Sequence, residues 1–174
     1  MTQPVTVRPA RLDDLRVIVE LRLALLREYG DHPLYANLRE DAEERAYELY
    51  QAQIMAPNEV IFVAERAKQV IGLLRCVDAG GSPLLFPDRY CYVSSVYVRP
   101  AERRRGVLHA MMRAAEQWCD SRGLGEMRLH NVNSSDVAQQ TWSSLGFDVV
   151  EHVRRRPLAN ASRRASAAEL RASR

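Results

Sequence analysis

The chain has 174 residues, of which 47% are apolar and 27% are charged, a length and composition typical of one compact globular domain. Its net charge of +3 is small and much of it falls near the C-terminus, so charge alone does not argue for a nucleic-acid partner. No apolar run approaches the roughly 20 residues that a bilayer-spanning helix needs, so no membrane partner is expected.

The start of the chain and its cysteines indicate the compartment. The polar N-terminal stretch MTQPVTVRP lacks the apolar core of a signal peptide, so we expect a cytoplasmic protein. Cys76, Cys91 and Cys119 are odd in number, lack CxxC spacing and fall within predicted elements. These features favour buried thiols over disulfides, a zinc site or a nucleophile, and we expect no metal site.

The N-terminal part predicts one strand and two helices. Residues 4–8 alternate as a short strand, and an acidic cap then begins a helix over about 13–29. Arg22 falls on the apolar face of this helix, where it either snorkels at the edge of the core, the interpretation we favour, or points a cation into a site. Residues 39–53 are helical again. Four residues are expected along one line of this second helix: Ala42, Ala46, Leu49 and Gln53.

The rest of the chain reads as strands and helices separated by clear turn signals. We predict a hairpin of two strands over 60–65 and 70–77, a loop over 79–87 and a long strand over 90–98. Beyond it we predict a helix from 107, a strand over 126–132, a helix over 136–145 and a last strand over 147–155. This order indicates a mixed α/β sheet with helices on both faces.

The segment SSVYVRPAERRRGVLHAMMRAAEQW, residues 94–118, combines a strand, an arginine-rich turn and an amphipathic helix. The first turn of a helix offers unpaired N–H groups and a partial positive charge to an anion. Arg103, Arg104 and Arg105 add three cations there, and Gly106 lacks the Cβ that would keep a phosphate away from the main chain. This pattern fits a pyrophosphate, although a solvated run of arginines is the alternative.

Two motifs resemble those of the GNAT N-acetyltransferase superfamily. The hexad Arg103 to Leu108 resembles its R-x-x-G-x-G/A turn, with Leu108 where the family has glycine or alanine. The stretch 133–147, NSSDVAQQTWSSLGF, resembles N-x-x-A-x-x-x-Y-x-x-x-G-F, with Ser135 at the asparagine position and Trp142 in place of the tyrosine. The resemblance covers about residues 4–156.

The resemblance implies a fold, a co-substrate and a set of binding residues. It implies a mixed, mostly antiparallel α/β sheet of about six to seven strands, splayed between the fourth and fifth strands, in a domain over 1–156. The tail over 157–174, rich in Ala, Ser and Arg, would be a solvated appendage or a short docked helix. The implied co-substrate is acetyl-CoA. The residues expected to bind it are Val96, Tyr97, Val98, Arg103, Arg104, Arg105, Gly106, Val107, Leu108, His109, Ser135, Ala138 and Trp142.

The motifs identify the catalytic acid and base less clearly than the residues that would bind the co-substrate. In the resembled family a tyrosine in the last helix often protonates the departing thiolate, and Trp142 is no practical acid. The strand positions that face the expected gap hold Tyr92 and Ser94, and neither is a good base. His130 on the next strand is the first candidate for the base, with Tyr92 as a relay, since imidazole changes charge between pH 5 and 8. A structural role for His130 is the alternative.

The acceptor is the part that the sequence identifies least. In the resembled family the segment between the first two helices covers the acceptor site, and here it is acidic. It holds Glu28, Tyr29, Asp31, His32, Tyr35 and the run from Glu40 to Glu44. These acids either attract a cationic amine or form a solvated helix face.

Three functions compete. The first is an acetyl-CoA-dependent N-acetyltransferase that acetylates a primary amine of a small molecule or peptide by direct attack in a ternary complex. The second is a catalytically weakened acyl-CoA-binding or regulatory protein of the same fold, because Leu108 and Trp142 depart from the motifs. The third, a nucleic-acid-binding module, rests on the arginine clusters alone, and we expect no nucleic-acid partner. A homodimer is compatible with each.

Overall fold

The computed structural model describes residues 3–132 and 135–158. The chain divides after His130 into two units, which are described separately. The first unit holds β1 (Thr6–Pro9), α1 (Leu15–Glu28), α2 (Ala42–Met55), β2 (Glu59–Arg66), β3 (Gln69–Gly80), β4 (Arg89–Val98), α3 (Val107–Arg122) and β5 (Met127–Leu129). Short 3-10 helices lie at Leu12–Asp14 and Pro100–Glu102. The second unit holds α4 (Asp136–Ser144).

The sheet has the order β1-β2-β3-β4-β5. Its first four strands pair antiparallel with their neighbours, and β5 is parallel to β4. The predicted hairpin is present, with Ala67 and Lys68 at φ 53° and 64° in its two-residue turn. Two positive φ values in succession are typical of the type I′ turn that matches strand twist. The predicted class, a mixed and mostly antiparallel α/β sheet, is confirmed.

Six to seven strands were predicted, whereas the sheet formed by the described residues has five. The strand predicted over 147–155 is wrong, since the described residues 147–158 contain neither helix nor strand. Val149, Val150 and Val153 favour extended backbone, but all three are exposed, Val150 at 89%. A β-branched run becomes a strand only where a neighbouring strand accepts its backbone hydrogen bonds, so propensity alone misled the prediction.

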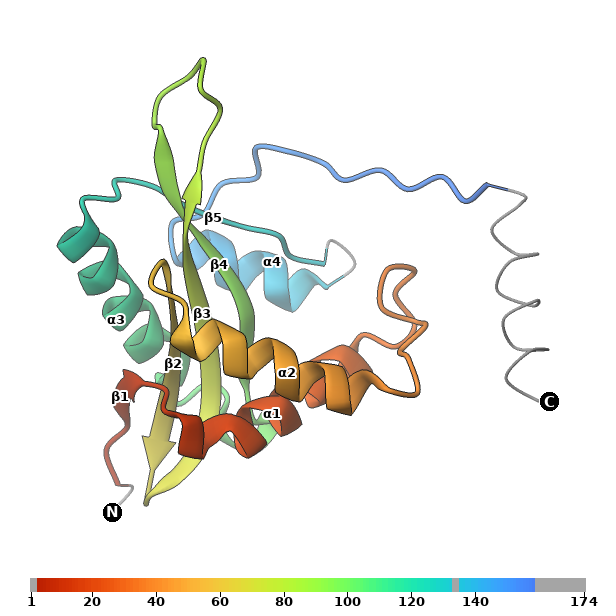
Figure 1. Cartoon of the computed structure of the whole chain (residues 1–174), viewed down its shortest axis with the longest axis vertical. Coiled ribbons are helices and arrows are strands. Elements are labelled where there is room, and N and C mark those ends of the chain that lie inside the picture. The colour runs from red at the N-terminus through yellow and green to blue at the C-terminus, as the bar shows by residue number, and fades with distance from the viewer. Residues whose placement is uncertain (1–2, 133–134, 159–174) are drawn as a thin grey trace. The chain divides into compact units, whose positions relative to one another are not determined.

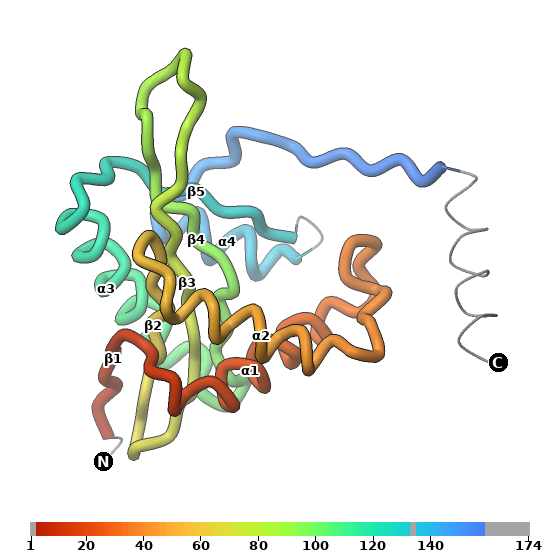
Figure 2. Tube along the Cα trace, in the orientation of Figure 1, coloured from red at the N-terminus to blue at the C-terminus, as the bar shows by residue number. Residues whose placement is uncertain are grey.

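Helices cover both faces of the sheet, as Figure 1 shows. On one face α1 and α2 lie side by side, and the chain trace in Figure 2 follows the connection between them. Ile61 and Val63 of β2 pack there against the buried Ile18 of α1 and Tyr50 of α2. On the other face α3 packs so closely that a Cβ at Gly72 would lie 3.4 Å from the Met111 side chain.

The buried face of α2 differs slightly from the expected line. Ala46 and Tyr50 are buried, whereas Leu49 is 53% exposed. The buried face is thus shifted by one residue, from Leu49 to Tyr50. This shift brings a tyrosine hydroxyl rather than a leucine side chain toward the sheet.

The three cysteines are buried and free, as predicted. Burial raises the pKa of Cys119 to about 12, which keeps its thiol protonated and unreactive near neutral pH. In the described part of the chain, no helix combines the length and apolar character needed to cross a bilayer.

A buried carboxylate fixes the start of α1 against the edge of the sheet. Asp14 is 8% exposed and accepts two hydrogen bonds from the Arg8 guanidinium, at 2.7 and 2.9 Å. It also accepts the backbone N–H of Arg11 at 2.8 Å, and Arg8 reaches Glu65 of β2 as well. The Arg8 hydrogen bonds hold the pKa of Asp14 below its usual range.

We predict that Asp14→Asn lowers the free energy of unfolding by about 1–3 kcal/mol, since the guanidinium loses its charged acceptor. Because the pKa of Asp14 is lowered in the folded state, the stabilisation is present above the pKa of an unfolded carboxyl and is lost as the pH falls through the folded-state pKa. Urea unfolding at neutral pH and in acid measures the loss of unfolding free energy and its dependence on pH. Asp13→Asn, at an exposed neighbour, is the control; an equal loss in the two variants would contradict the prediction.

Candidate active site

The pairing between β4 and β5 is confined to one end of β4. Cys91, Tyr92 and Val93 lie opposite residues 127–129, and β4 continues to Val98 without a β5 partner among the described residues. The predicted separation of the fourth and fifth strands therefore begins after Val93. Along the unpaired stretch the backbone can accept an extended ligand as it would another strand. The predicted residues Val96, Tyr97 and Val98 lie in this stretch.

A bulge interrupts β4 at the start of that stretch. Leu73 and Arg75 of β3, two residues apart, lie opposite Tyr97 and Ser94 of β4, three residues apart. The bulge contains Ser95, whose φ of 53° is a left-handed backbone conformation. This conformation costs roughly 1–2 kcal/mol for a residue with a Cβ. The Ser95 hydroxyl forms a hydrogen bond of 3.0 Å with the hydroxyl of Tyr50, so α2 holds the bulge in place.

The bulge decides which side chains share a face. In a regular strand Ser94 and Tyr97 would point to opposite faces, because side chains alternate. With one extra residue between them, both face α1 and α2, and Tyr97 is buried against Leu21 and Leu73. Its side chain belongs to the core, so only its backbone is available to a ligand.

Tyr92 and His130, the expected relay and base, lie in contact. The Tyr92 hydroxyl lies 2.8 Å from His130 Nδ1, and the two rings meet edge to face with centroids 5.6 Å apart. Burial raises the pKa of Tyr92, so its hydroxyl keeps its proton near neutral pH. His130 lies just beyond the end of β5 and is exposed. An imidazole thus lies where β4 and β5 separate, hydrogen-bonded to a phenol on β4.

The turn between β4 and α3 has the geometry expected of an anion site. Gly106 is the N-cap of α3 at φ 75°, and no side chain caps the first turn of the helix. A Cβ built on Gly106 would meet nothing within 4 Å, so the space beside the main chain is open. Arg104 also has a positive φ, of 60°. The uncapped N–H groups and the open space favour a phosphate group at this position.

The three arginines of the turn have different surroundings. Arg103 binds Glu28 of α1 with both guanidinium nitrogens, at 2.9 and 2.6 Å, and lies 5.4 Å from the Tyr97 ring centroid. Its bonds to Glu28 raise the pKa of Arg103. Arg105 is exposed and 3.8 Å from Glu102, and Arg104 has no ion-pair partner among the described residues. Arg104 and Arg105 are therefore better placed than Arg103 to meet a phosphate.

The next three predicted residues are on the first turn of α3. Val107 is 2% exposed, and its side chain belongs to the core. Leu108 is half-buried and His109 is exposed. Their contribution to an anion site comes from backbone N–H groups more than from side chains.

The other predicted cofactor residues lie in the second unit. Ser135 is the N-cap of α4 and accepts the Ala138 N–H at 3.2 Å. At the other end of α4, Phe147 N–H binds the Trp142 carbonyl and Gly146 has φ 84°, which together form a Schellman turn. The Trp142 and Phe147 rings pack edge to face, 5.4 Å apart. Trp142 thus has a structural role, and its contact with a cofactor stays a prediction.

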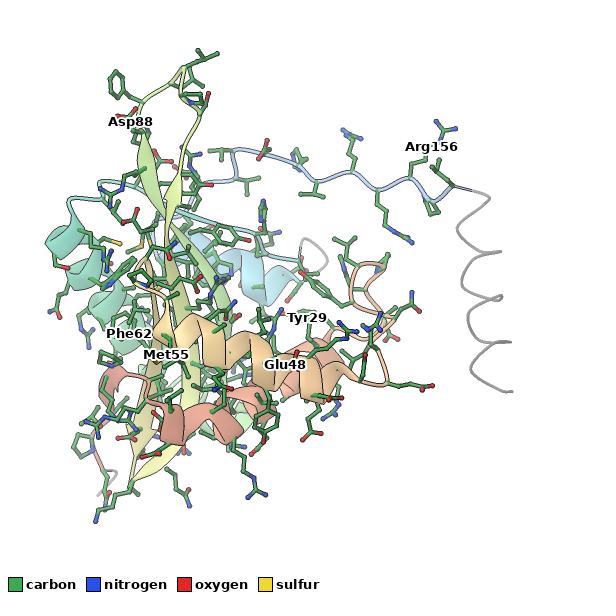
Figure 3. The ribbon with its side chains drawn as sticks, in the orientation of Figure 1. Tyr29, Glu48, Met55, Phe62, Asp88 and Arg156 are labelled. Atoms are coloured by element: carbon green, nitrogen blue, oxygen red, sulfur yellow. The ribbon has the colours of Figure 1, made fainter. Side chains whose placement is uncertain are left out.

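The segment between α1 and α2 borders a pocket of about 310 Å³. Tyr35 lines it, but the acids that were expected to attract an amine do not. Glu28 binds Arg103, and Asp41 binds Arg39 and Arg45, each at 2.7 Å. Figure 3 draws the side chains of this region, with Glu48 labelled on the exposed side of α2.

Three residues of the site were missed by sequence reasoning. Tyr50 lies four residues after the buried Ala46, a spacing that could have identified it. Arg75 is a charge within an otherwise apolar strand, which called for a partner: its guanidinium binds Glu59 at 2.7 Å and Ser94 at 3.2 Å. Ser95 carried no signal, because a bulge depends on how two strands pair.

The first unit thus combines a strand with an open edge, a bulge, an uncapped helix N-terminus and a tyrosine–histidine pair, an arrangement suited to a phosphate-bearing ligand. The family model described as "Acetyltransferase (GNAT) family" matches residues 21–147. The chain therefore belongs to the acetyltransferase (GNAT) family. Acetyl-CoA as co-substrate agrees with this family. No curated protein sequence matches the chain.

Solved structures are similar in fold. A predicted acetyltransferase from Clostridium acetobutylicum with acetyl-CoA has a TM-score of 0.73 and 18% identity, over 90% of this chain and 98% of that one. A GCN5-related N-acetyltransferase from Ralstonia eutropha JMP134 has a TM-score of 0.72 and 22% identity, over 90% and 99%. An aminoglycoside 6'-N-acetyltransferase from Acinetobacter haemolyticus has a TM-score of 0.71 and 21% identity, over 88% and 97%.

We predict that Ser95→Ala is less stable than Ser95→Gly by about 1 kcal/mol, because both lose the hydroxyl and only alanine has a Cβ at φ 53°. Urea unfolding of the two variants measures the difference. The same pair at Ser94 is the control. There φ is not positive, and glycine should be the less stable residue. Equal stability of the two Ser95 variants would mean that the bulge carries no strain.

Proposed function

We propose that this chain transfers the acetyl group of acetyl-CoA to a primary amine of a small molecule or peptide, by direct attack within a ternary complex. The observation that supports this most is the layout of one continuous stretch, residues 92–106. It presents in order the tyrosine bound to His130, the bulge, the open strand edge and the uncapped N-terminus of α3.

The chain's own groups fit the parts of acetyl-CoA. The open space at Gly106 and the N–H groups of the first turn of α3 suit the pyrophosphate, with Arg104 and Arg105 adding positive charge. The backbone of Val96 to Val98 suits the amide-bearing arm, which can pair with it like a strand. When bound, acetyl-CoA supplies an activated acyl group. A backbone N–H near the bulge can then polarise the thioester carbonyl.

The Tyr92–His130 pair can take up the amine's proton in either tautomer of the imidazole. If Nδ1–H of His130 donates a hydrogen bond to the Tyr92 oxygen, Nε2 keeps a lone pair and can accept a proton from the amine directly or through water. In the other tautomer Nδ1 accepts the tyrosine proton, and Tyr92 passes the amine's proton to the imidazole as a relay. In both cases His130 holds the proton, and Tyr92 orients the ring.

Protonation of the departing thiolate has no dedicated tyrosine. Trp142 stands at that motif position, and an indole N–H is not a practical acid. The proton taken up by His130 is the nearest alternative source, returned through Tyr92 or water. One residue would then serve both halves of the proton transfer.

A thiol-release assay over a panel of primary amines tests the proposal. Release of CoA thiol that depends on both acetyl-CoA and an amine supports it. Calorimetry separates the alternatives: tight acetyl-CoA binding without turnover on any amine would identify a binding or regulatory protein, and binding of duplex DNA without acetyl-CoA would identify a nucleic-acid module.

We predict that Gly106→Asp abolishes acetyl-CoA binding, because it places a negative charge where the pyrophosphate would lie. Gly106→Ala weakens binding less than Gly106→Asp, since its Cβ enters the space beside the main chain and disfavours φ 75° but brings no negative charge. Calorimetry measures both. Gly123→Asp is the control, because Gly123 ends the same helix with φ 66° and equally open surroundings. Unchanged affinity in a folded Gly106→Asp protein would remove the turn from the site.

We predict that the rate on a good acceptor rises with pH through an ionisation near neutrality, and that His130→Gln removes this rise and lowers turnover by about 10²-fold or more. The pH profile of kcat/KM measures both effects. His152→Gln, at an exposed histidine of the second unit, should keep the profile of the natural protein. If the rise survives in His130→Gln, the ionisation belongs to the acceptor amine and catalysis rests on positioning.

A further inference from the structure

The pocket between α1 and α2 has an apolar wall and a basic polar lining. Leucines from both helices and the connecting segment form the wall, among them Leu23, Leu26 and Leu38. Its charged lining residues are Arg22, Arg39 and Arg45. No carboxylate is among the residues that line it, all of which belong to the described part of the chain.

Only one of these arginines is free to meet a ligand. Arg39 and Arg45 are both bound to Asp41 and are 65% and 59% exposed, so they lie at the rim. Arg22 is half-buried on α1, between Leu21 and Leu23, and forms no ion pair or hydrogen bond within the described residues. A partly desolvated guanidinium without a partner is unfavourable unless an anion completes it.

The pocket is connected to the strand where the acyl group is transferred. Tyr50 lines the pocket and forms the hydrogen bond to Ser95 in the β4 bulge. Arg22 lines the same pocket as Tyr50. A ligand held at Arg22 would therefore lie on the side of the pocket that Tyr50 joins to the β4 bulge.

We infer, on the basis of the proposed function, that the acceptor is an amino carboxylate with an apolar body: Arg22 binds its carboxylate, the leucines hold its apolar part, and its amine faces the β4 bulge. A guanidinium binds a carboxylate with two parallel hydrogen bonds, which also fixes the direction of the amine. A polycationic acceptor of the aminoglycoside kind would meet the unpaired Arg22 and no carboxylate in the lining, because the Asp41 that neutralises the two rim arginines is not a lining residue. The charge of the lining thus selects against it.

Three acceptors separate these possibilities: leucine, isopentylamine, which is leucine without its carboxylate, and the polycation spermidine. Thiol release should favour leucine over isopentylamine by about 10–100-fold in kcat/KM, the range expected for a charged hydrogen bond. Preference for isopentylamine or spermidine would overturn the inference while leaving the acetyltransferase function intact.

The variant Arg22→Gln should raise the KM for leucine by about 10–100-fold and leave that for isopentylamine within about twofold, with Arg22→Lys in between. Arg27→Gln removes the same charge from an exposed position of α1 outside the pocket and should change neither. An equal loss for leucine and isopentylamine in a folded Arg22→Gln protein would contradict the assignment of Arg22 to the carboxylate.

Binding without turnover distinguishes this inference from the proposed function. Calorimetry of leucine with the CoA-saturated protein should show binding that is lost in Arg22→Gln and retained in Arg27→Gln. If leucine binds in this way but no amine releases thiol from acetyl-CoA, the acceptor assignment stands and the catalytic proposal fails. If thiol is released with other amines and leucine does not bind, the acceptor assignment fails alone.

Discussion

The hydrogen bond between Tyr50 and Ser95 connects a helix of the pocket to the irregular point of β4, and the arrangement of the site depends on it. Ser95 takes a left-handed backbone that its side chain disfavours. In return, the bulge lets Tyr92, Ser94 and Tyr97 share one face. Without the extra residue, either Tyr97 would leave the core or Tyr92 would turn away from the gap, because a shift of one residue reverses every side chain.

The two ends of the site follow the same electrostatic rule. At the N-terminus of α3, backbone donors are left uncapped and arginines surround them, while Glu28 neutralises Arg103 and fixes the turn to α1. At the pocket, Asp41 neutralises two rim arginines and Arg22 is left without a partner. In both places an acid holds the structural arginines and leaves separate positive charge available to a ligand.

The parts of the fold that are determined locally could be predicted from the sequence. The hairpin turn at Ala67 and Lys68, the stop of α3 at Gly123 and the start of α3 after Gly106 each depend on nearby residues. The sequence also placed Tyr92 and His130 on or next to adjacent strands.

Features that need a partner far along the chain could not be predicted. The bulge at Ser95 depends on how β3 pairs with β4, and the valines of 147–155 form no strand despite their propensity. Arg22 is the clearest case. Its helical position allowed either a snorkelling side chain or a cation pointed into a site, and only the segment between α1 and α2 makes it part of a pocket.

The strand edge and the anion turn are backbone features, whereas the pocket is made of side chains, and this difference has a consequence for specificity. Backbone geometry tolerates many sequences, which is consistent with TM-scores near 0.7 at identities of 18–22% to solved structures. The sign of the pocket's charge, by contrast, changes with one or two substitutions on α1 or α2. Members of one fold can therefore share the acyl donor and differ entirely in the acceptor, and the acceptor has to be argued from residues such as Arg22 rather than from the fold.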